Sequence, residues 1–429
     1  MNKNYIGPSE IMRKKTEYLI PCSYHFFKEP PQLSRGKMQY LFDHNNKKYL
    51  DFFAGVSVMN FGHCNEEIIN TTIDQIKTLQ HTTTIYLTQP IVDLAEKLAT
   101  VLPGNLKRSF FCMSGSEANE GAMLLAKLHT GREEFIYLEA GLHGRTHLTM
   151  SVNGIKMWRT SPTPQSGTFQ AKSYYPDIKN NDFDIEMAMY ESLKDIEKIL
   201  EDRRNKIAAL IVEPIQGNGG ILTPHKEYFV RLKKLLNKHN SLLIVDEVQS
   251  GFARTGKMFA IEHFNVCPDI LTMAKALGNG QPIAAFSTTD DIATSFTQPS
   301  ASTLGGNPVS AATSLAVLNY IENNSLCESS MQKGEYLRKG LISLKNKFPI
   351  IRDVRGFGLM HGAELVEGSS PASNLTDIIL EKMKEKGILI GKNGIDRNVL
   401  AFQPPLIITT EDIDECINTL DTILSELFK

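Results

Sequence analysis

Cysteine is scarce in this chain, with six residues among 429 and no CxxC pair. Such scattered cysteines indicate reduced, mostly buried thiols rather than a disulfide framework. Residues 1–15 are polar and lack the apolar stretch of a secretory signal, so we expect a cytoplasmic protein. No run of about 18 apolar residues occurs, so no membrane span is expected.

The chain also lacks a large net charge and several common catalytic motifs. The net charge of −2 gives no reason to expect nucleic acid or an anionic membrane as a partner. The chain has no GxxxxGK[ST] phosphate loop, no strand-following GxGxxG with a later acidic residue, and no GxSxG turn. No group of histidines and cysteines has the spacing of a zinc site.

What the chain does have is the composition of an ordinary globular protein, with 41% hydrophobic and 22% charged residues. Its length favours one large core plus a smaller domain. Prolines near the start predict an irregular arm, and an α+β pattern closes the chain. We expect an N-terminal arm and part of a small domain at 1–60, a large domain at 61–320 and a small C-terminal domain at 321–429.

Between these ends, apolar runs alternate with helical patterns. Because the apolar runs are continuous, they predict strands covered on both faces, as in a mainly parallel α/β sheet. Helices are predicted at 117–130 and 226–239, and again at 310–323 and 329–347. The expected strands are 109–113, 134–138, 208–212, 242–245, 270–273 and 283–287.

Two of these strands end near charged residues that suit one kind of chemistry. Asp246 directly follows the strand at 242–245, and Lys275 comes soon after the strand at 270–273. A lysine at the sheet edge where ligands bind can form a Schiff base with an aldehyde, and an aspartate there can keep a pyridine nitrogen protonated. Taken singly, Lys275 could be a surface lysine and Asp246 a helix cap.

Three further strand ends carry polar groups that have two readings each. Gly115 and Ser116 precede a helix, where free N–H groups bind phosphate, although a plain helix cap is the commoner use. The loop at Leu142 and His143 could approach a cofactor ring or be a polar turn. Glu213 could contact a substrate ammonium or an arginine, or lie on the surface before a proline turn.

In this order the motifs resemble those of the class III aminotransferases over nearly the whole chain. The matching motifs are Tyr49–His63, 114–118, His143-Gly144, Glu213-Pro214, Asp246–Gln249, Lys275 and Thr303–Pro308. Pro21–Phe27 and Gly256–His263 are most similar to the branch of second-type alanine–glyoxylate aminotransferases. The resemblance implies the type I pyridoxal phosphate fold: a mainly parallel seven-stranded sheet in a large domain, with a smaller α+β domain formed by the C-terminal part and the N-terminal arm.

The resemblance also implies a cofactor, pyridoxal 5'-phosphate, and roles for matched residues. Lys275 would form the Schiff base and then move a proton as general acid and base. Asp246 would pair with the pyridinium nitrogen. Thr303 would reach the phosphate of the partner subunit, which implies a homodimer with shared active sites. The other cofactor contacts would be Gly115, Ser116, Leu142, His143, Glu213, Val248 and Gln249.

Two positions depart from the family's pattern. Leu142 stands where the family usually has Tyr or Phe, so aromatic stacking on the ring is lost. Ala401 stands where many relatives have an arginine that binds a substrate carboxylate and, in several of them, pairs with the residue matching Glu213. Because an unpaired buried glutamate is costly, we expect either that Arg397 substitutes or that Glu213 binds a cationic or polar donor.

The implied activity is transfer of an amino group from an omega- or beta-amino acid, an aminosulfonate or an amine to a 2-oxo acid such as pyruvate, glyoxylate or 2-oxoglutarate. The substrate contacts would be Tyr24, Val58, Glu213, Arg397 and Ala401, and no metal is implied. Two alternatives stay open: a racemase or decarboxylating enzyme on the same fold, and a catalytically idle binding protein. The intact Lys275 and Asp246 argue against the idle protein.

Overall fold

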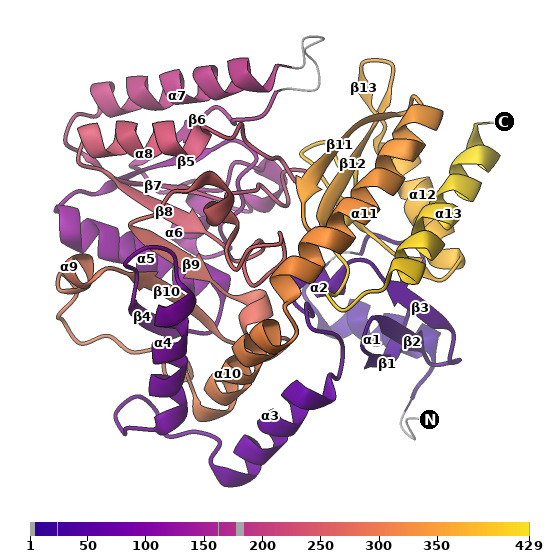
Figure 1. Ribbon diagram of the computed structural model, residues 1–429, viewed down its shortest axis with the longest axis horizontal. Helices are drawn as coiled ribbons and strands as arrows, with labels where there is room; N and C mark the ends of the chain where they lie inside the picture. The colour runs from indigo at the N-terminus through magenta and orange to yellow at the C-terminus, as the bar shows by residue number, and fades with distance from the viewer. Residues whose placement is uncertain (1–4, 24, 162, 177–183, 429) are drawn as a thin grey trace.

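The computed structural model describes residues 5–23, 25–161, 163–176 and 184–428. Figure 1 shows a larger body on the left, built around a β-sheet, and a smaller body on the right that contains both ends of the chain. The predicted fold class is confirmed, with a mainly parallel seven-stranded sheet and a smaller α+β part. The domain boundaries near residues 60 and 320 stay predictions.

The central sheet has the strand order β4-β10-β9-β8-β7-β5-β6. β10 is antiparallel to both of its neighbours, and the other pairs are parallel. The strands are β4 (Arg108–Cys112), β5 (Glu134–Leu138), β6 (Thr168–Ala171), β7 (Ile207–Val212), β8 (Leu242–Asp246), β9 (Ile270–Met273) and β10 (Ala284–Thr288). All six predicted strands are confirmed. The sequence analysis missed β6, because its four residues are mostly half-buried and form no apolar run.

Alternate residues of the central strands enter two apolar cores, one on each face of the sheet. Leu210 of β7 belongs to the core that contains Leu232 of α8 (Tyr228–Lys238), whereas Ile211 belongs to the core that contains Met123 of α5 (Gly115–Thr130). The helix α7 (Ile185–Asp202) packs beside α8. Since both faces are covered, the strands have to be apolar throughout, which is why their runs are visible in the sequence.

The rest of the larger body is mostly helical. The long helix α10 packs against α3 and α4, and it confirms the helix predicted at 310–323. Every helix in the described residues is too short or too polar to cross a bilayer. These elements are α3 (Glu66–Thr78), α4 (Gln89–Val101), α6 (His147–Ser151), α9 (Asp290–Ala293), α10 (Pro308–Asn323), and the short turns η1 (Lys156–Trp158), η2 (Ala260–Phe264) and η3 (Lys275–Leu277).

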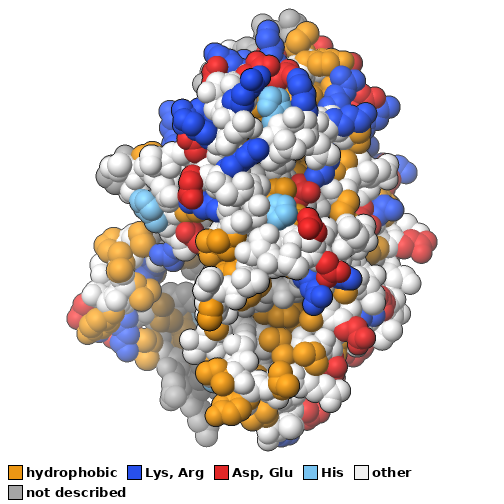
Figure 2. Space-filling model, turned by 90° about the vertical axis from the view of Figure 1, so that its left-hand side faces the viewer, with side chains coloured by type: hydrophobic (Ala, Val, Ile, Leu, Met, Phe, Trp, Pro, Cys, Tyr) orange, Lys and Arg blue, Asp and Glu red, His pale blue; other side chains and the backbone are white. Residues whose placement is uncertain are grey.

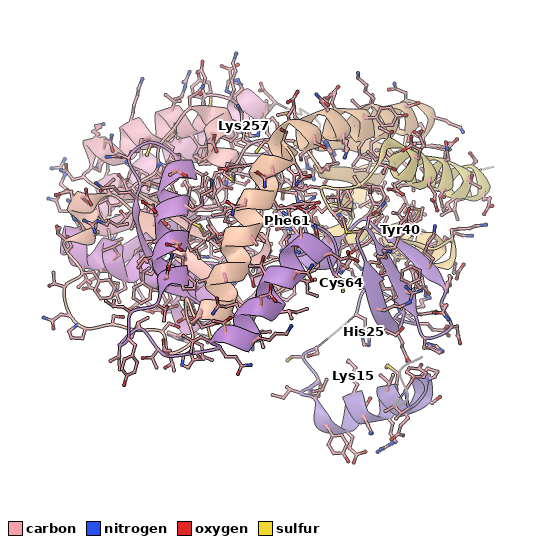
Figure 3. All side chains as sticks on the ribbon, turned by 60° about the horizontal axis from the view of Figure 1, so that its bottom comes forward. Lys15, His25, Tyr40, Phe61, Cys64 and Lys257 are labelled. Atoms are coloured by element: carbon pink, nitrogen blue, oxygen red, sulfur yellow. The ribbon has the colours of Figure 1, made fainter. Side chains whose placement is uncertain are left out.

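The smaller body joins the two ends of the chain in one sheet. The strands β1, β2 and β3 near the N-terminus form a four-stranded sheet with β14, and a second sheet has the order β11-β12-β16-β15. The helix α1 stands apart from these strands, as Figure 3 shows. The elements are α1 (Pro8–Tyr18), β1 (Leu33–Lys37), β2 (Tyr40–Asp43), β3 (Lys48–Asp51), α2 (Ala54–Ser57), α11 (Leu326–Lys347), β11 (Ile351–Phe357), β12 (Met360–Glu367), β13 (Ser370–Pro371), α12 (Ser373–Glu385), β14 (Ile388–Leu389), β15 (Gly391–Asn393), β16 (Val399–Phe402) and α13 (Thr410–Leu427).

The surface has an uneven distribution of apolar side chains. On the face shown in Figure 2 they gather in the lower half, at the level where Figure 1 places α3 and α4, while charged side chains dominate the upper end. The segment between α3 and α4 contains Ile85 and Leu87, whose residues are 83% and 96% exposed. Such large exposed apolar residues mark a surface suited to contact with another protein.

Candidate active site

Lys275 and Asp246 meet at the carboxyl edge of the central sheet. Asp246 is the last residue of β8 and pairs with Thr272 of the parallel neighbour β9, while Lys275 follows β9 after Ala274. Lys275 has a left-handed backbone with φ of 46°. Burial lowers the pKa of its ammonium group, and the carboxylates of Asp246 and Glu213 oppose that shift. The lysine is therefore placed where an amine nucleophile is expected in an α/β fold.

These two residues face a pocket of about 400 Å³. Its lining comes from loops that are far apart in the sequence, and most of the predicted cofactor contacts lie in it. The lining includes Val58, Met113, Ser114, Gly115, Ser116, Asn119, Leu142, His143, Gly144, Asp246, Val248, Ala274, Lys275 and Gly280 to Ile283.

The Asp246 carboxylate is held by three donors. Its Oδ2 accepts hydrogen bonds from His143 Nδ1 at 2.8 Å and from Asn119 Nδ2 at 2.7 Å, and its Oδ1 accepts one from the Val248 N–H at 3.0 Å. Because a carboxylate only accepts, His143 carries its proton on Nδ1. These donors stabilise the ionised carboxylate, which is the form that pairs with a protonated pyridine nitrogen.

The sequence analysis missed Asn119, the side chain that joins these groups. Its amide also donates to the His143 carbonyl at 2.7 Å, and its Oδ1 accepts from the Thr272 hydroxyl at 2.6 Å. Asn119 is only 1% exposed. One signal was available: a polar residue one turn after Ser116 on α5, where a helix covering a sheet is expected to be apolar.

A second missed residue, Asn153, fixes the loop that carries His143. Its Oδ1 accepts from the N–H groups of His143 and Gly144 at 2.7 and 3.3 Å, and its Nδ2 donates to the Gly144 carbonyl at 2.8 Å. No sequence motif marks this residue, because its partners lie in a loop ten residues earlier.

The loop before α5 contains the predicted helix cap, and the phosphate-binding reading stays a prediction. Ser114 caps the helix by accepting from the Glu117 N–H at 3.2 Å. A side chain at Gly115 would lie 2.9 Å from the Val248 side chain, so this backbone must stay bare. The Ser116 hydroxyl accepts from the Arg145 N–H at 3.0 Å, which ties the phosphate-type loop to the His143 loop. A helix start of this kind binds anions well.

Glu213 is satisfied by the backbone. It is 5% exposed, and its two oxygens accept hydrogen bonds from the N–H groups of Leu142 at 2.8 Å and Gly217 at 2.9 Å. Burial raises its pKa to about 7, with the nearby His143 lowering it and Asp246 raising it. The sequence analysis expected either Arg397 or a cationic or polar donor to meet this carboxylate, and it did not consider these N–H groups, which satisfy the carboxylate without an arginine.

Neither Ala401 nor Arg397 takes part in the hydrogen bonds that the Glu213 carboxylate accepts. Ala401 is fully buried in an apolar cluster with Ile215 and Met360. The guanidinium of Arg397 lies over the ring of Phe26, 5.2 Å from its centroid. An apolar cluster thus surrounds the position where the resemblance implies an arginine in many relatives.

The other predicted contacts are distributed as follows. Gln249 is 7% exposed and donates to Gln403 Oε1 at 3.2 Å. Thr303 lines a separate cavity of about 270 Å³ beside the segment 81–92. Tyr24 lies outside the described residues.

This donor set fits pyridoxal 5'-phosphate. Asp246 offers an ionised oxygen to a ring nitrogen, Lys275 offers an amine to an aldehyde, and the bare backbone at Gly115 opens a helix toward a phosphate. The fold and the site therefore define a pyridoxal phosphate enzyme of fold type I.

Comparisons with known proteins give the family. Residues 28–424 match the family described as aminotransferase class-III, and the chain belongs to that family. It is 43% identical to "Alanine--glyoxylate aminotransferase 2 homolog 2, mitochondrial" of Arabidopsis thaliana, over 99% of this chain and 89% of the relative. It is 40% identical to the acetylornithine aminotransferase of Methanocaldococcus jannaschii, over 93% and 95%. A solved Bacillus anthracis aminotransferase superposes with a TM-score of 0.90 at 32% identity, over 97% and 98%. The chain is thus a pyridoxal-phosphate-dependent aminotransferase.

Proposed function

We propose that this aminotransferase takes the amino group of a small omega- or beta-amino acid, aminosulfonate or amine and gives it to a short 2-oxo acid, pyruvate or glyoxylate. The carrying observation is that Ala401 is fully buried in an apolar cluster with Ile215 and Met360, so an alanine methyl group stands where the resemblance implies an arginine. Among the described residues that line the pocket, Lys275 is the only lysine or arginine. A substrate with a second, distal carboxylate would therefore find no second cation among these lining residues, and an unpaired carboxylate in the pocket is costly.

Within this proposal the site residues have the following tasks. The cofactor, when bound, supplies an electron sink that stabilises the carbanion formed at the substrate carbon. Lys275 binds the cofactor aldehyde and moves the proton, and Asp246 holds the ring nitrogen in its protonated form. Val248 and Leu142 enclose the two faces of the ring. Gly115, Ser116 and the partner's Thr303 bind the phosphate, and Val58 and Glu213 border the substrate.

We further propose a homodimer with shared sites. Ile85, Tyr86, Leu87 and Val92 are 83, 69, 96 and 56% exposed, more than a monomer usually leaves in one segment. The same segment forms the cavity that contains Thr303. A second copy docked here would cover the apolar residues seen in the lower half of Figure 2 and bring Thr303 to a neighbouring site.

We also propose a cytoplasmic location. All six cysteines are free thiols, two of them exposed, which favours a reducing compartment. Fractionation of cells that express the full chain would test this.

A donor-by-acceptor screen of the separate half-reactions tests the substrate proposal. We expect amination of pyruvate or glyoxylate by the pyridoxamine form, and poor use of 2-oxoglutarate. The variant Ala401→Arg should improve 2-oxoglutarate relative to pyruvate, and Ala401→Leu is the matched control for bulk. Equal use of 2-oxoglutarate and pyruvate by the unaltered protein would overturn the proposal. Inversion of an amino acid without any acceptor would favour the racemase alternative.

A further inference from the structure

Arg254 is a fully buried arginine that the reaction itself does not use. It is 0% exposed and is the largest of the fully buried side chains in the described chain. It lies only five residues after Gln249, in the segment that leaves β8 and the cofactor pocket. A buried guanidinium is retained at a cost, so its contacts indicate what it does.

Its guanidinium joins three segments of the smaller body. Nη1 donates to the carbonyl of Leu359 at 2.8 Å and to that of Pro404 at 2.6 Å, and Nη2 donates to Asn60 Oδ1. The backbone carbonyl of Arg254 also accepts from the Leu359 N–H at 3.0 Å. Leu359 lies between β11 and β12, Pro404 follows β16, and Asn60 follows the turn α2.

One of these segments lines the pocket, and the other two lie against Gly217 and the predicted cofactor contact Gln249. Val58, two residues before Asn60, lines the pocket itself. Met360, directly after Leu359, extends its methyl group to within 3.2 Å of where a side chain on Gly217 would begin. Gln403, directly before Pro404, accepts a hydrogen bond from Gln249 Nε2 at 3.2 Å.

The wall that carries Val58 needs such support, because its backbone is strained. Residues Ala54, Gly55, Val56 and Ser57 have φ values of 49°, 60°, 67° and 58°, which form a left-handed turn. A left-handed residue other than glycine costs roughly 1–2 kcal/mol. Asp51 caps this turn, accepting from the N–H groups of Phe53 and Ala54 at 2.9 and 2.8 Å, and its charge also supports Arg254.

Beyond Asn60 the chain is fixed by packing. Phe61, labelled in Figure 3 beside α10, meets the ring of Tyr320 with centroids 6.2 Å apart. The Asn60 carbonyl accepts from the Leu406 N–H at 2.7 Å, close to the second Arg254 contact at Pro404. The segments of Asn60 and Pro404 are thus linked to each other as well as to Arg254.

We propose that Arg254 is a positioning residue that sets the pocket wall at Val58, and the segments of Met360 and Gln403 behind it, relative to the cofactor segment. The inference rests on the proposed substrate side of the pocket. The cofactor side is held independently, because Asp246 is fixed by His143 and Asn119, and His143 by Asn153. Loss of Arg254 should therefore affect substrate binding and turnover while leaving cofactor binding nearly unchanged.

The test compares Arg254→Met and Arg254→Lys with Arg132→Met. Arg132 is a suitable control because its Nη1 also donates to two backbone carbonyls, those of Ile207 and His239 at 3.2 and 2.9 Å, at the opposite end of the sheet strands. Asn60→Leu removes one Arg254 acceptor with little change of volume, and it serves if both Arg254 variants fail to fold. The measurements are the pyridoxal phosphate dissociation constant and the half-reaction kcat and KM for the best donor.

For Arg254→Met we expect a fall in kcat/KM of roughly tenfold to a hundredfold, the range in which a displacement of about 1 Å acts. The dissociation constant of the cofactor should change less than about threefold, because the proposed contacts at Asp246, Lys275 and Gly115 make no hydrogen bond to Arg254. Arg254→Lys and Asn60→Leu should lose less, and Asn60→Leu should add little in the Arg254→Met background.

Two results would overturn the inference. One is a cofactor dissociation constant that rises as much as kcat/KM falls. The other is an equal loss in Arg132→Met, which would show a general loss of stability. A failure of the substrate proposal can be distinguished from these two results. In that case the unaltered protein prefers another acceptor, but the Arg254 variants still lose more activity than Arg132→Met with whichever donor reacts.

Discussion

Replacing Glu213 by glutamine should change the pH dependence of stability in a defined direction. In the native protein both carboxylate oxygens accept backbone N–H groups, from Leu142 and Gly217. A glutamine has one oxygen and one NH₂ group at those positions, so one N–H would face another donor. An unmade buried hydrogen bond costs about 1–3 kcal/mol, which is the penalty expected at acid pH, where the native side chain is neutral too.

The native glutamate also makes a contribution to stability that depends on pH, and its loss at higher pH offsets the penalty of the glutamine. Burial raises the pKa of Glu213 from 4.5 to about 7, so the folded protein holds the proton more tightly than the unfolded chain does. The stability from this proton is fully present below pH 4.5 and is lost as the pH rises to about 7. One pKa unit corresponds to about 1.36 kcal/mol. Between pH 5 and 8 the free energy of unfolding of the native protein should therefore fall by about 2–3 kcal/mol, whereas that of Glu213→Gln should not show this fall.

Thermal unfolding of the cofactor-free protein at pH 5 and pH 8 measures this difference. The melting temperature of Glu213→Gln should lie clearly below that of the unaltered protein at pH 5 and approach or pass it at pH 8. Glu133→Gln is the control for the same exchange at the surface, since the Glu133 side chain is 77% exposed, and it should change the melting temperature little. A Glu213→Gln difference that stays constant, or grows with pH, would refute the raised pKa.

Other expected outcomes concern the cofactor cradle. Asn119→Leu removes a hydrogen-bond donor from the Asp246 carboxylate. It should raise the pyridoxal phosphate dissociation constant by roughly tenfold to a hundredfold, which is the contribution of a hydrogen bond to a charged group. Equilibrium titration of the apoprotein measures this constant, and an unchanged value would contradict the role given to Asn119. Gly115→Ala places a methyl group 2.9 Å from the Val248 side chain and should weaken cofactor binding as well. Gly131→Ala is its control, because that glycine has open space around it and a φ of 66°, so only local strain is expected there.

The strands that end at Asp246 and shortly before Lys275 could be predicted because both faces of the sheet are covered, which makes the strands apolar along their whole length. Their order in the sheet then brings the two residues to one edge. β6 could not be predicted in the same way, since its four residues are mostly half-buried.

The hydrogen-bond partners behind the site could not be predicted, because they depend on contacts between distant segments. Asn119 reaches Asp246 across 127 residues, and Arg254 reaches Pro404 across 150. The partners of Glu213 could not be predicted either, because they are backbone groups. The sequence indicates which arginine is missing at Ala401, but backbone N–H groups leave no trace in a sequence, so the satisfied carboxylate was not foreseen.

The most direct measurement is the absorbance of the purified protein after addition of pyridoxal phosphate and then of an amine donor. The assigned role of Lys275 predicts a band near ~420 nm from the Schiff base with the lysine, which disappears as stoichiometric keto product forms and returns on addition of pyruvate or glyoxylate. Lys275→Ala should show neither the lysine-bound band nor turnover, although it should still bind the cofactor through the Asp246 side of the pocket. A protein that never develops the band, or a Lys275→Ala variant that cycles between donor and acceptor at the native rate, would contradict the assignment.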